Sequence, residues 1–235
     1  FMIPEFPNFK KLELTDKEDV EKFTSKFPPY SDFHFSSMWV WDIQDHIKIS
    51  QLNKNLVVIF SDYLSGEPFL SFIGKNKIAE TAAMLIAFSE KNYKLSHLKL
   101  IPEEIAIILL ESGFKITPDA DSNDYIFSVS HLANMNNWPQ NSSGKKIRQF
   151  IKLNTNYMVK ESSVEEMLKD EHTKMFERWA KNKNIENHFE LNEYKAFKKF
   201  LQAENKNMKV ISLYVNDKII GFTVYEILSN GYAIS

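Results

Sequence analysis

The stretch "MKVISLYVNDKIIGFTVYEIL", residues 208–228, decides the fold of the second half of the chain. On both sides of the pair Asn216-Asp217, apolar residues alternate with others, which is the period of a half-buried strand. Asn and Asp both tolerate positive φ, so this pair predicts a tight hairpin turn. Together with the short run "GYAIS" (231–235), the stretch predicts an antiparallel meander.

Upstream of this meander, the pattern predicts one more strand and two amphipathic helices. The strand is "YMVKE" (157–161), and Ser163 with Glu166 has the capping-box spacing that starts a long helix. The apolar face of that helix consists of Val164, Met167, Leu168, Met175 and Trp179. The second helix lies in "NEYKAFKKFLQAE" (192–204), with Tyr194, Phe197, Phe200 and Leu201 inward and Lys195, Lys198 and Lys199 outward.

The first half of the chain mixes strands and helices in a similar order. The predicted strands are "NLVVIF" (55–60), "PFLSFIG" (68–74), "HLKLI" (97–101), "FKI" (114–116) and "DYIFSV" (124–129). One predicted helix starts near Asp16, where Thr15 and Glu18 have capping-box spacing. Two more predicted helices cover residues 76–92 and 102–113. The fold class is therefore α+β, with one unit at 1–133 and a second at 134–235, joined near the polar residues 134–143.

Composition excludes several classes of protein. The formal net charge of −2 argues against a nucleic-acid coat, and the absence of cysteine fits a reducing cytoplasm. No two of the six glycines lie within seven residues of each other, which excludes a Rossmann fingerprint and a P-loop. None of the six histidines lies four residues from another, so there is no zincin helix, and we predict no metal site. The apolar runs are far shorter than the roughly 20 residues of a membrane span.

A basic helix is predicted at about 143–154. In it, Lys145, Arg148 and Lys152 have i, i+3, i+7 spacing and share one face, with Lys146 beside them. The preceding residues 142–144 would add backbone N–H donors of the kind that bind anions at a helix N-terminus. The pattern favours two interpretations equally: a solvated basic face, which is common, or a clamp for phosphate groups.

Two other segments contain candidate site residues. Gly221 interrupts an otherwise strong strand, which indicates a bulge, a close approach by another group, or relief of crowding under a helix. Phe222 follows it, and Glu226 near the end of this strand is either a catalytic base or an exposed strand-end side chain. Asp124 and Tyr125 are either a polar pair in a cleft or only the start of a strand.

Several segments, in this order along the chain, resemble the phosphatidylglycerol lysyltransferase C-terminal domain family. They are "YSDFHFSSMWVW" (30–41), "SNDYIFSVSHLA" (122–133), "GKKIRQFIKLNTNY" (144–157), "RWA" (178–180), "NEYKAF" (192–197) and "VNDKIIGFTVYE" (215–226). The resemblance runs from about residue 5 to residue 235 and rests on the order of the segments. It implies two tandem GNAT-like units, the second apparently incomplete at its C-terminal end.

The resemblance implies transfer of an amino acid from aminoacyl-tRNA to a lipid hydroxyl, or to a peptide amine as in Fem-type relatives. Lys145, Lys146, Arg148 and Lys152 would then hold tRNA or lipid phosphate. The resemblance places Gly221, Phe222 and Glu226 on the acceptor side, with Glu226 and Asp124 as candidate catalytic groups and Tyr125 and Trp179 as further binding residues. No cofactor is implied, and a lipid acceptor would be reached by a cytoplasmic protein peripheral to the membrane.

Three departures from the family keep two other functions open. The basic stretch is shorter than is usual in the family, the chain ends at "GYAIS" within the last meander, and no Q/R-x-x-G-x-G/A loop is present. One alternative is an N-acetyltransferase that uses acyl-CoA. The other is a non-catalytic GNAT-fold module that binds a lipid headgroup or nucleic acid. The residues name neither the amino acid nor the acceptor, and they leave the oligomeric state open.

Overall fold

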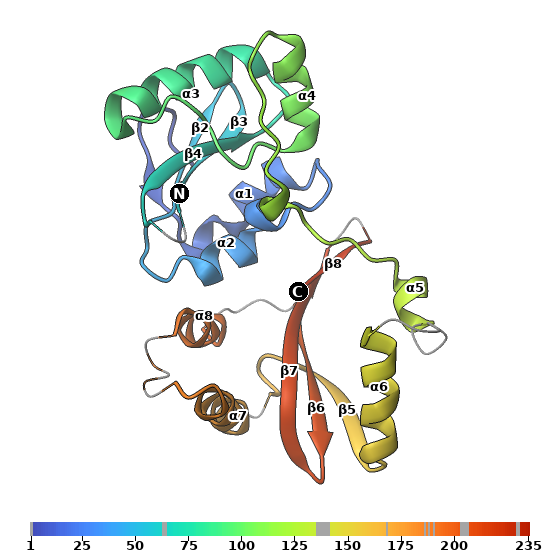
Figure 1. The fold of residues 1–235 in the computed structure, drawn as a ribbon. Coiled ribbons are helices and arrows are strands. Elements are labelled where there is room, and N and C mark those ends of the chain that lie inside the picture. Colours follow the sequence, from blue (N-terminus) through green and yellow to red (C-terminus); the bar gives the residue numbers. More distant parts are fainter. Residues whose placement is uncertain are drawn as a thin grey trace. The chain divides into compact units, whose positions relative to one another are not determined.

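The computed structural model describes residues 2–62, 65–134, 142–167, 169–185, 187, 189, 191–202, 207–228 and 231–235. It contains two four-stranded antiparallel sheets flanked by helices (Figure 1), which confirms the predicted α+β class. Within each sheet the strands lie side by side in chain order, β1-β2-β3-β4 and β5-β6-β7-β8.

The elements follow one another in a repeated order. The first sheet comprises β1 (Lys10–Lys11), β2 (Lys48–Leu52), β3 (Asn55–Ser61) and β4 (Pro68–Ile73), with η1 (Leu14–Asp16), α1 (Lys17–Thr24), η2 (Ser31–Phe33) and α2 (Phe35–Trp41) between β1 and β2. After it come α3 (Ile78–Tyr93), α4 (Glu103–Glu111), η3 (Ala120–Ser122), α5 (Val129–Ala133) and α6 (Ser142–Leu153). The second sheet comprises β5 (Tyr157–Ser163), β6 (Met208–Val215), β7 (Lys218–Ile227) and β8 (Ala233–Ile234), with α7 (Lys169–Asn182) and α8 (Asn192–Phe200) between β5 and β6. Each sheet therefore has one strand, an intervening helical segment and three further strands.

Residue contacts divide the chain into two compact units. The first contains residues 1–123 together with 195–203, and the second contains 124–194 together with 204–235. The second half of α8 thus belongs to the first unit. Most of the predicted linker at 134–143 lies outside the described residues.

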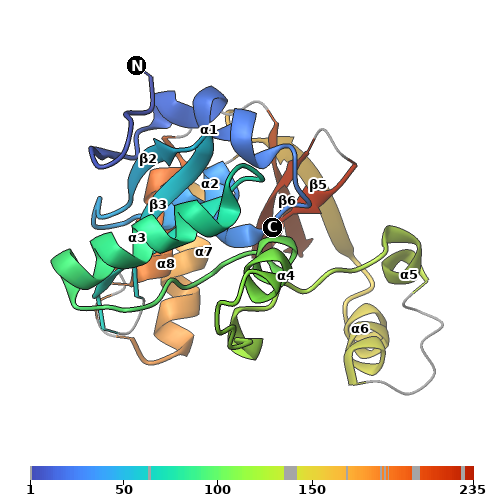
Figure 2. The ribbon, with the colours of Figure 1, turned by 90° about the horizontal axis from the view of Figure 1, so that it is seen from above.

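The first sheet is covered on both sides. Figure 1 shows α3 on one side of it and α1 and α2 on the other, and α3 lies along the sheet in Figure 2 as well. Six successive residues of β3 are accordingly buried, and so are the last five of β4. The helices predicted at 76–92 and 102–113 are confirmed as α3 and α4, the latter preceded by Pro102 and followed by Gly113 with φ +89°.

Three predicted strands of the first half are wrong: 97–101, 114–116 and 124–129 form no strand in the described structure. The segment 97–101 makes only isolated contacts with β4, in which the Lys99 N–H donates to the Leu70 carbonyl at 3.2 Å and the Ser71 hydroxyl donates to the Leu100 carbonyl at 3.0 Å. Strand propensity describes how well a side chain packs on the surface of a sheet. It does not tell whether a neighbouring strand is available to form the hydrogen bonds of a ladder, so these three segments were wrongly predicted.

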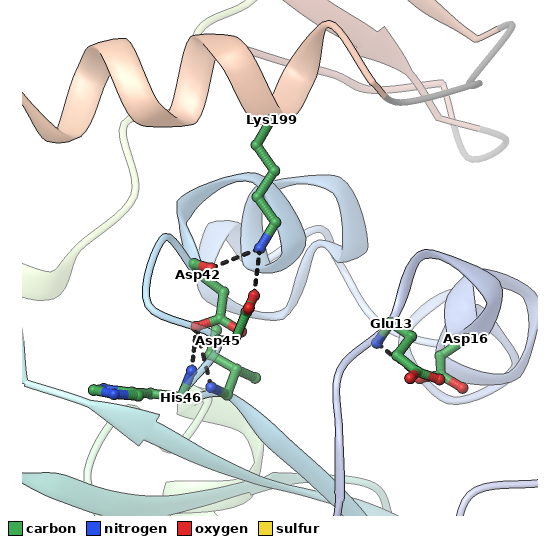
Figure 3. Close-up of polar contacts among 7 residues, drawn as sticks. Glu13, Asp16, Asp42, Asp45, His46 and Lys199 are labelled. Atoms are coloured by element: carbon green, nitrogen blue, oxygen red, sulfur yellow. Dashed lines mark hydrogen bonds and ion pairs between the residues drawn. The ribbon is translucent and has the colours of Figure 1, made fainter. Parts of the chain in front are cut away.

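One predicted helix start is wrong, and another is confirmed with a different capping pair. Ser163 and Glu166 do exchange the two capping-box hydrogen bonds, at 3.1 and 3.2 Å, but α7 begins only at Lys169. Ser163 is still paired with Lys209 as the last residue of β5, so a turn must intervene before the helix. Near the N-terminus, α1 begins at Lys17 with Asp16 as its N-cap, as predicted, but the capping pair is Glu13 with Asp16 and not Thr15 with Glu18 (Figure 3).

Lys199 was expected on the outer face of its helix, and that expectation is wrong. Its ammonium donates to the Asp42 carbonyl at 2.6 Å and pairs with the Asp45 carboxylate at 3.2 Å (Figure 3). The ammonium also lies 5.2 Å from the centre of the Trp39 ring. The Asp42 carboxylate accepts the backbone N–H groups of His46 and Ile47, which fixes the turn that presents its carbonyl. Lys199 is thus a structural residue of the first unit.

The second sheet has the predicted hairpin. Asn216 and Asp217 have φ of +50° and +60°, the left-handed values that a type I′ turn requires at both positions. Burial alternates strictly along β6 between buried and half-buried residues, because one face of the sheet is covered and the other is partly exposed. The residues 208, 210, 212 and 214 point to what we call the covered face, and the residues between them point to the open face.

Candidate functional site

The basic helix forms where it was predicted, as α6. Lys145, Lys146, Arg148 and Lys152 are all exposed, and α6 contains no acidic residue. A cluster of positive charge without an acidic neighbour on the same helix attracts anions, and its effect extends about 8 Å at physiological salt. The helix therefore presents a basic surface within the second unit.

A contact between two aromatic rings joins helix α6 to the open face of the second sheet. The Phe150 ring packs edge-on against the Tyr157 ring, with 6.0 Å between centroids. Tyr157 pairs with Val215, and Gly221 pairs with Leu213, two residues earlier on the same strand. Because side chains two residues apart in a strand share a face, Tyr157 and Gly221 belong to the same side of the sheet. The basic helix is thus attached to the face on which Gly221 lies.

Gly221 lies next to a β-bulge. Leu213 pairs with Gly221 and the next residue, Tyr214, pairs with Ile219, so Ile220 is the extra residue in the described pairing of β6 with β7. A Cβ added to Gly221 would meet no described heavy atom within 4 Å, which removes crowding as the reason for this glycine. The bulge, one of the three interpretations of this glycine, is present, and no atom of the described residues fills the space over Gly221.

The bulge is held from helix α7. The Arg178 guanidinium donates from Nη2 to the Ile219 carbonyl at 2.7 Å. Hydrogen bonds from a charged donor are shorter and stronger than neutral ones, so this is a strong contact for a backbone carbonyl. Arg178 was not among the predicted site residues, because nothing in a helix sequence indicates which distant carbonyl a side chain reaches.

Phe222 and Glu226 do not line the same surface as Gly221. Phe222 pairs with Ser212 and Glu226 pairs with Met208, so both point to the covered face. Glu226 is only 3% exposed, which overturns the interpretation of an exposed strand-end side chain. Gly221, Phe222 and Glu226 were expected together on the acceptor side. Because successive side chains of a strand point to opposite faces, Gly221 lies on one face of the sheet and the other two residues on the opposite face.

A buried histidine accompanies Phe222 on the covered face. His172 of α7 is 1% exposed, its Nε2 lies 2.8 Å from the Ser212 hydroxyl, and its ring meets Phe222 edge-on at 5.0 Å. Sequence reasoning missed His172 because its neighbours in "KDEHTK" are charged or polar. Its position three residues before Met175 and seven before Trp179 was the available signal, since this spacing places it on the inward face.

The remaining predicted site residues lie elsewhere in the second unit. Asp124 and Tyr125 are exposed, Tyr125 to 90%, in the segment without regular structure between η3 and α5. Trp179 is half-buried on α7, where its ring contacts Phe176 edge-on with 5.3 Å between centroids. The described contacts join none of these three residues to Gly221.

The open face also contains a pair that the sequence did not indicate. The Tyr225 hydroxyl on β7 donates to the Glu161 carboxylate on β5 at 2.7 Å. This hydrogen bond to Glu161 raises the pKa of Tyr225 above its ordinary value, with smaller contributions from burial and from the carboxylate charge. Tyr225 pairs with Lys209 and Glu161 with Ile211, so the pair shares the face of Gly221.

Two features are absent from the residues that the structure describes. No helix among them has the length and apolar character to cross a membrane. Within the same part of the chain, no group of three or more His, Asp or Glu side chains is arranged to hold a metal ion.

The two antiparallel sheets of equal strand order, each with a helical segment after its first strand, define an α+β protein of two tandem units. The sequence matches the family described as phosphatidylglycerol lysyltransferase, C-terminal, over residues 25–234, and the chain belongs to this family. This membership confirms the resemblance on which the expected function rests and suggests a function of the aminoacyl-transferase type.

A solved structure supports the fold. A conserved protein of unknown function from Bacteroides thetaiotaomicron VPI-5482 superposes with a TM-score of 0.68 at 21% sequence identity. The match covers 95% of this chain and 75% of that protein. No curated protein matches the chain significantly.

Proposed function

We propose that this protein transfers an amino acid from aminoacyl-tRNA to a hydroxyl or amine acceptor, on a GNAT-like second unit. The observation that supports this most directly is the attachment of the basic helix α6 to the open face of the sheet, the face of Gly221. A phosphorylated donor held by α6 could therefore extend its reactive end along that face. Family membership is the independent support.

In this proposal the exposed side chains of Lys145, Lys146 and Arg148 bind tRNA phosphates. The ester carbonyl of the donor lies over Gly221, where the absence of a side chain lets a ligand approach the backbone. Backbone N–H groups aimed at a carbonyl stabilise the oxyanion that forms in acyl transfer. In this proposal such a group comes from the bulge beside Gly221, at its extra residue Ile220.

The chemistry needs no covalent enzyme intermediate, because the ester is already activated. The acceptor oxygen or nitrogen bonds to the ester carbon, the bond to the tRNA 3′ oxygen breaks, and the acceptor proton passes through a base to that oxygen. Glu226 is poorly placed for this role, since it is buried on the covered face. Glu161 is the better candidate base, because its carboxylate lies on the open face beside the Tyr225 hydroxyl.

The proposal is tested by binding titrations against aminoacyl-tRNA, uncharged tRNA and acetyl-CoA at 50 and 200 mM salt. With three phosphate contacts, tRNA affinity should fall roughly 20-fold between the two salt concentrations. The double variant Lys145→Ala/Arg148→Ala should abolish most of this salt-dependent binding. A matched control, Lys195→Ala/Lys198→Ala, removes two exposed charges from α8 and should bind as the wild type does.

Two outcomes would overturn the proposal in different ways. Salt-insensitive binding of acetyl-CoA, with turnover, would identify an N-acetyltransferase. tRNA binding that is equal for both double variants would leave α6 as a solvated basic helix.

A further inference from the structure

The segment around Gly221 is held from α7 on both sides of the bulge. Before the bulge, Arg178 donates to the Ile219 carbonyl at 2.7 Å. After it, the His172 ring meets Phe222 at 5.0 Å, while His172 Nε2 lies 2.8 Å from the hydroxyl of Ser212, the residue opposite Phe222. One rigid helix therefore fixes the strand at both ends of its irregular segment, so the bulge cannot shift along β7 without breaking one of these contacts.

The contact with Arg178 has a chemical consequence as well as a mechanical one. The Ile219 carbonyl and the Ile220 N–H belong to the same peptide group. A charged donor on the carbonyl polarises that group, and hydrogen bonds in a chain strengthen one another. The Ile220 N–H thereby becomes a stronger donor, in the bulge that directly precedes Gly221.

We propose that Arg178 is a positioning residue of the acyl-transfer site, which fixes the bulge and polarises the peptide group whose N–H receives the donor carbonyl. This inference rests on the proposed function for the identity of the carbonyl. Arg178 acts through the backbone and touches no substrate. Its side chain is exposed apart from this contact, so substitution leaves the buried core of the second unit unchanged.

The first test measures amide hydrogen exchange of the full chain by NMR for Arg178→Met, Arg178→Lys and the control Lys181→Met. Lys181 lies on the same helix and is exposed. Loss of a charge-assisted bond should loosen the bulge and accelerate exchange roughly tenfold in Arg178→Met at Ile219 and Gly221, which pair with β6 on either side of Ile220, with the rest of β6 and β7 within twofold. Arg178→Lys, which keeps one charged donor, should restore part of the protection, and Lys181→Met should match the wild type. Unchanged exchange at the bulge, or acceleration along both strands, would overturn the proposal.

The second test measures transfer from aminoacyl-tRNA and separates kcat from KM. A residue that polarises the bulge acts in the transition state, so kcat should fall roughly tenfold in Arg178→Met while KM for the tRNA stays within twofold. Equal losses in Arg178→Met and Lys181→Met would contradict a positioning role. A wild-type protein without transfer activity would instead overturn the proposed function, and the exchange experiment would still decide whether Arg178 holds the bulge.

Discussion

The first sheet is buried on both faces, whereas the second is buried on one. In β3 and β4 nearly every residue is inaccessible, and the buried polar side chains there serve the fold. Asn55 is an example: it binds Thr81 and both backbone groups of Asn76, and thereby fixes the connection into α3. In the second sheet β5 is largely exposed and burial alternates along β6. A sheet with one open face can offer backbone and side chains to a ligand, and the candidate site lies there.

The largest expected effect compares two isoleucines at the ends of strands. Ile73 closes β4 and is 1% exposed, whereas Ile227 closes β7 and is 55% exposed. Ile73→Ala should cost about 2–5 kcal/mol of unfolding free energy, because it leaves a cavity in a close-packed core. Ile227→Ala should cost less than about 1 kcal/mol. Urea denaturation of both variants measures the difference, and similar losses would refute the distinction between the two sheets.

Two glycines sharpen the same comparison. A Cβ at Gly74 would lie 2.1 Å from Asn55 Oδ1, whereas a Cβ at Gly221 would meet no described atom within 4 Å. Gly74→Ala should therefore destabilise the protein by about 1–3 kcal/mol through overpacking, and Gly221→Ala by no more than about 0.5 kcal/mol. Thermal and urea unfolding measure stability, and the transfer assay measures function. We expect Gly221→Ala to lose activity while keeping stability, and retention of both would argue against a ligand over Gly221.

Substitution of Lys199 tests how much its polar contacts stabilise the first unit. Lys199 is 17% exposed in its side chain and binds the Asp42 carbonyl, whereas Lys198 next to it is exposed. Lys199→Met should cost about 1–2 kcal/mol, mostly from the charged hydrogen bond, since the ion pair with Asp45 is largely in solvent. Lys198→Met should cost almost nothing. Denaturation curves that coincide for the two variants would show that the Asp42 contact contributes no net stability.

The smallest expected effect is the shift in the pKa of Tyr225 on the open face. The hydrogen bond to Glu161 raises the pKa of Tyr225 above its ordinary 10.0, so the folded state favours the protonated phenol. The stability from this contact is therefore complete below pH 10.0 and is lost as pH rises through the folded pKa. Ultraviolet titration of the phenolate, taken as wild type minus Tyr225→Phe, measures this pKa. Glu161→Gln should lower it toward the ordinary value, and an unchanged titration would show that the pair does not form in solution.

Sequence patterns predicted the local elements well wherever the signal was itself local. The Asn216-Asp217 pair requires two left-handed residues, so it specified the hairpin and the antiparallel sense of β6 and β7 without further information. The basic helix followed from its own spacing and is exposed as predicted. By contrast, the run 124–129 has strand propensity but no neighbouring strand, and the sequence could not show this lack.

The sequence by itself thus determined the α+β class, the hairpin, the basic helix α6 and, through its order of segments, the family. Only the tertiary structure decided which residues share a surface. It placed Gly221 on the open face and Phe222 and Glu226 on the covered one, brought Arg178 to the Ile219 carbonyl, and buried His172 beside Ser212. The physical reason is that turns and helix faces depend on neighbours in the chain, whereas these contacts join residues about 40 positions apart, whose meeting depends on how helix and sheet pack.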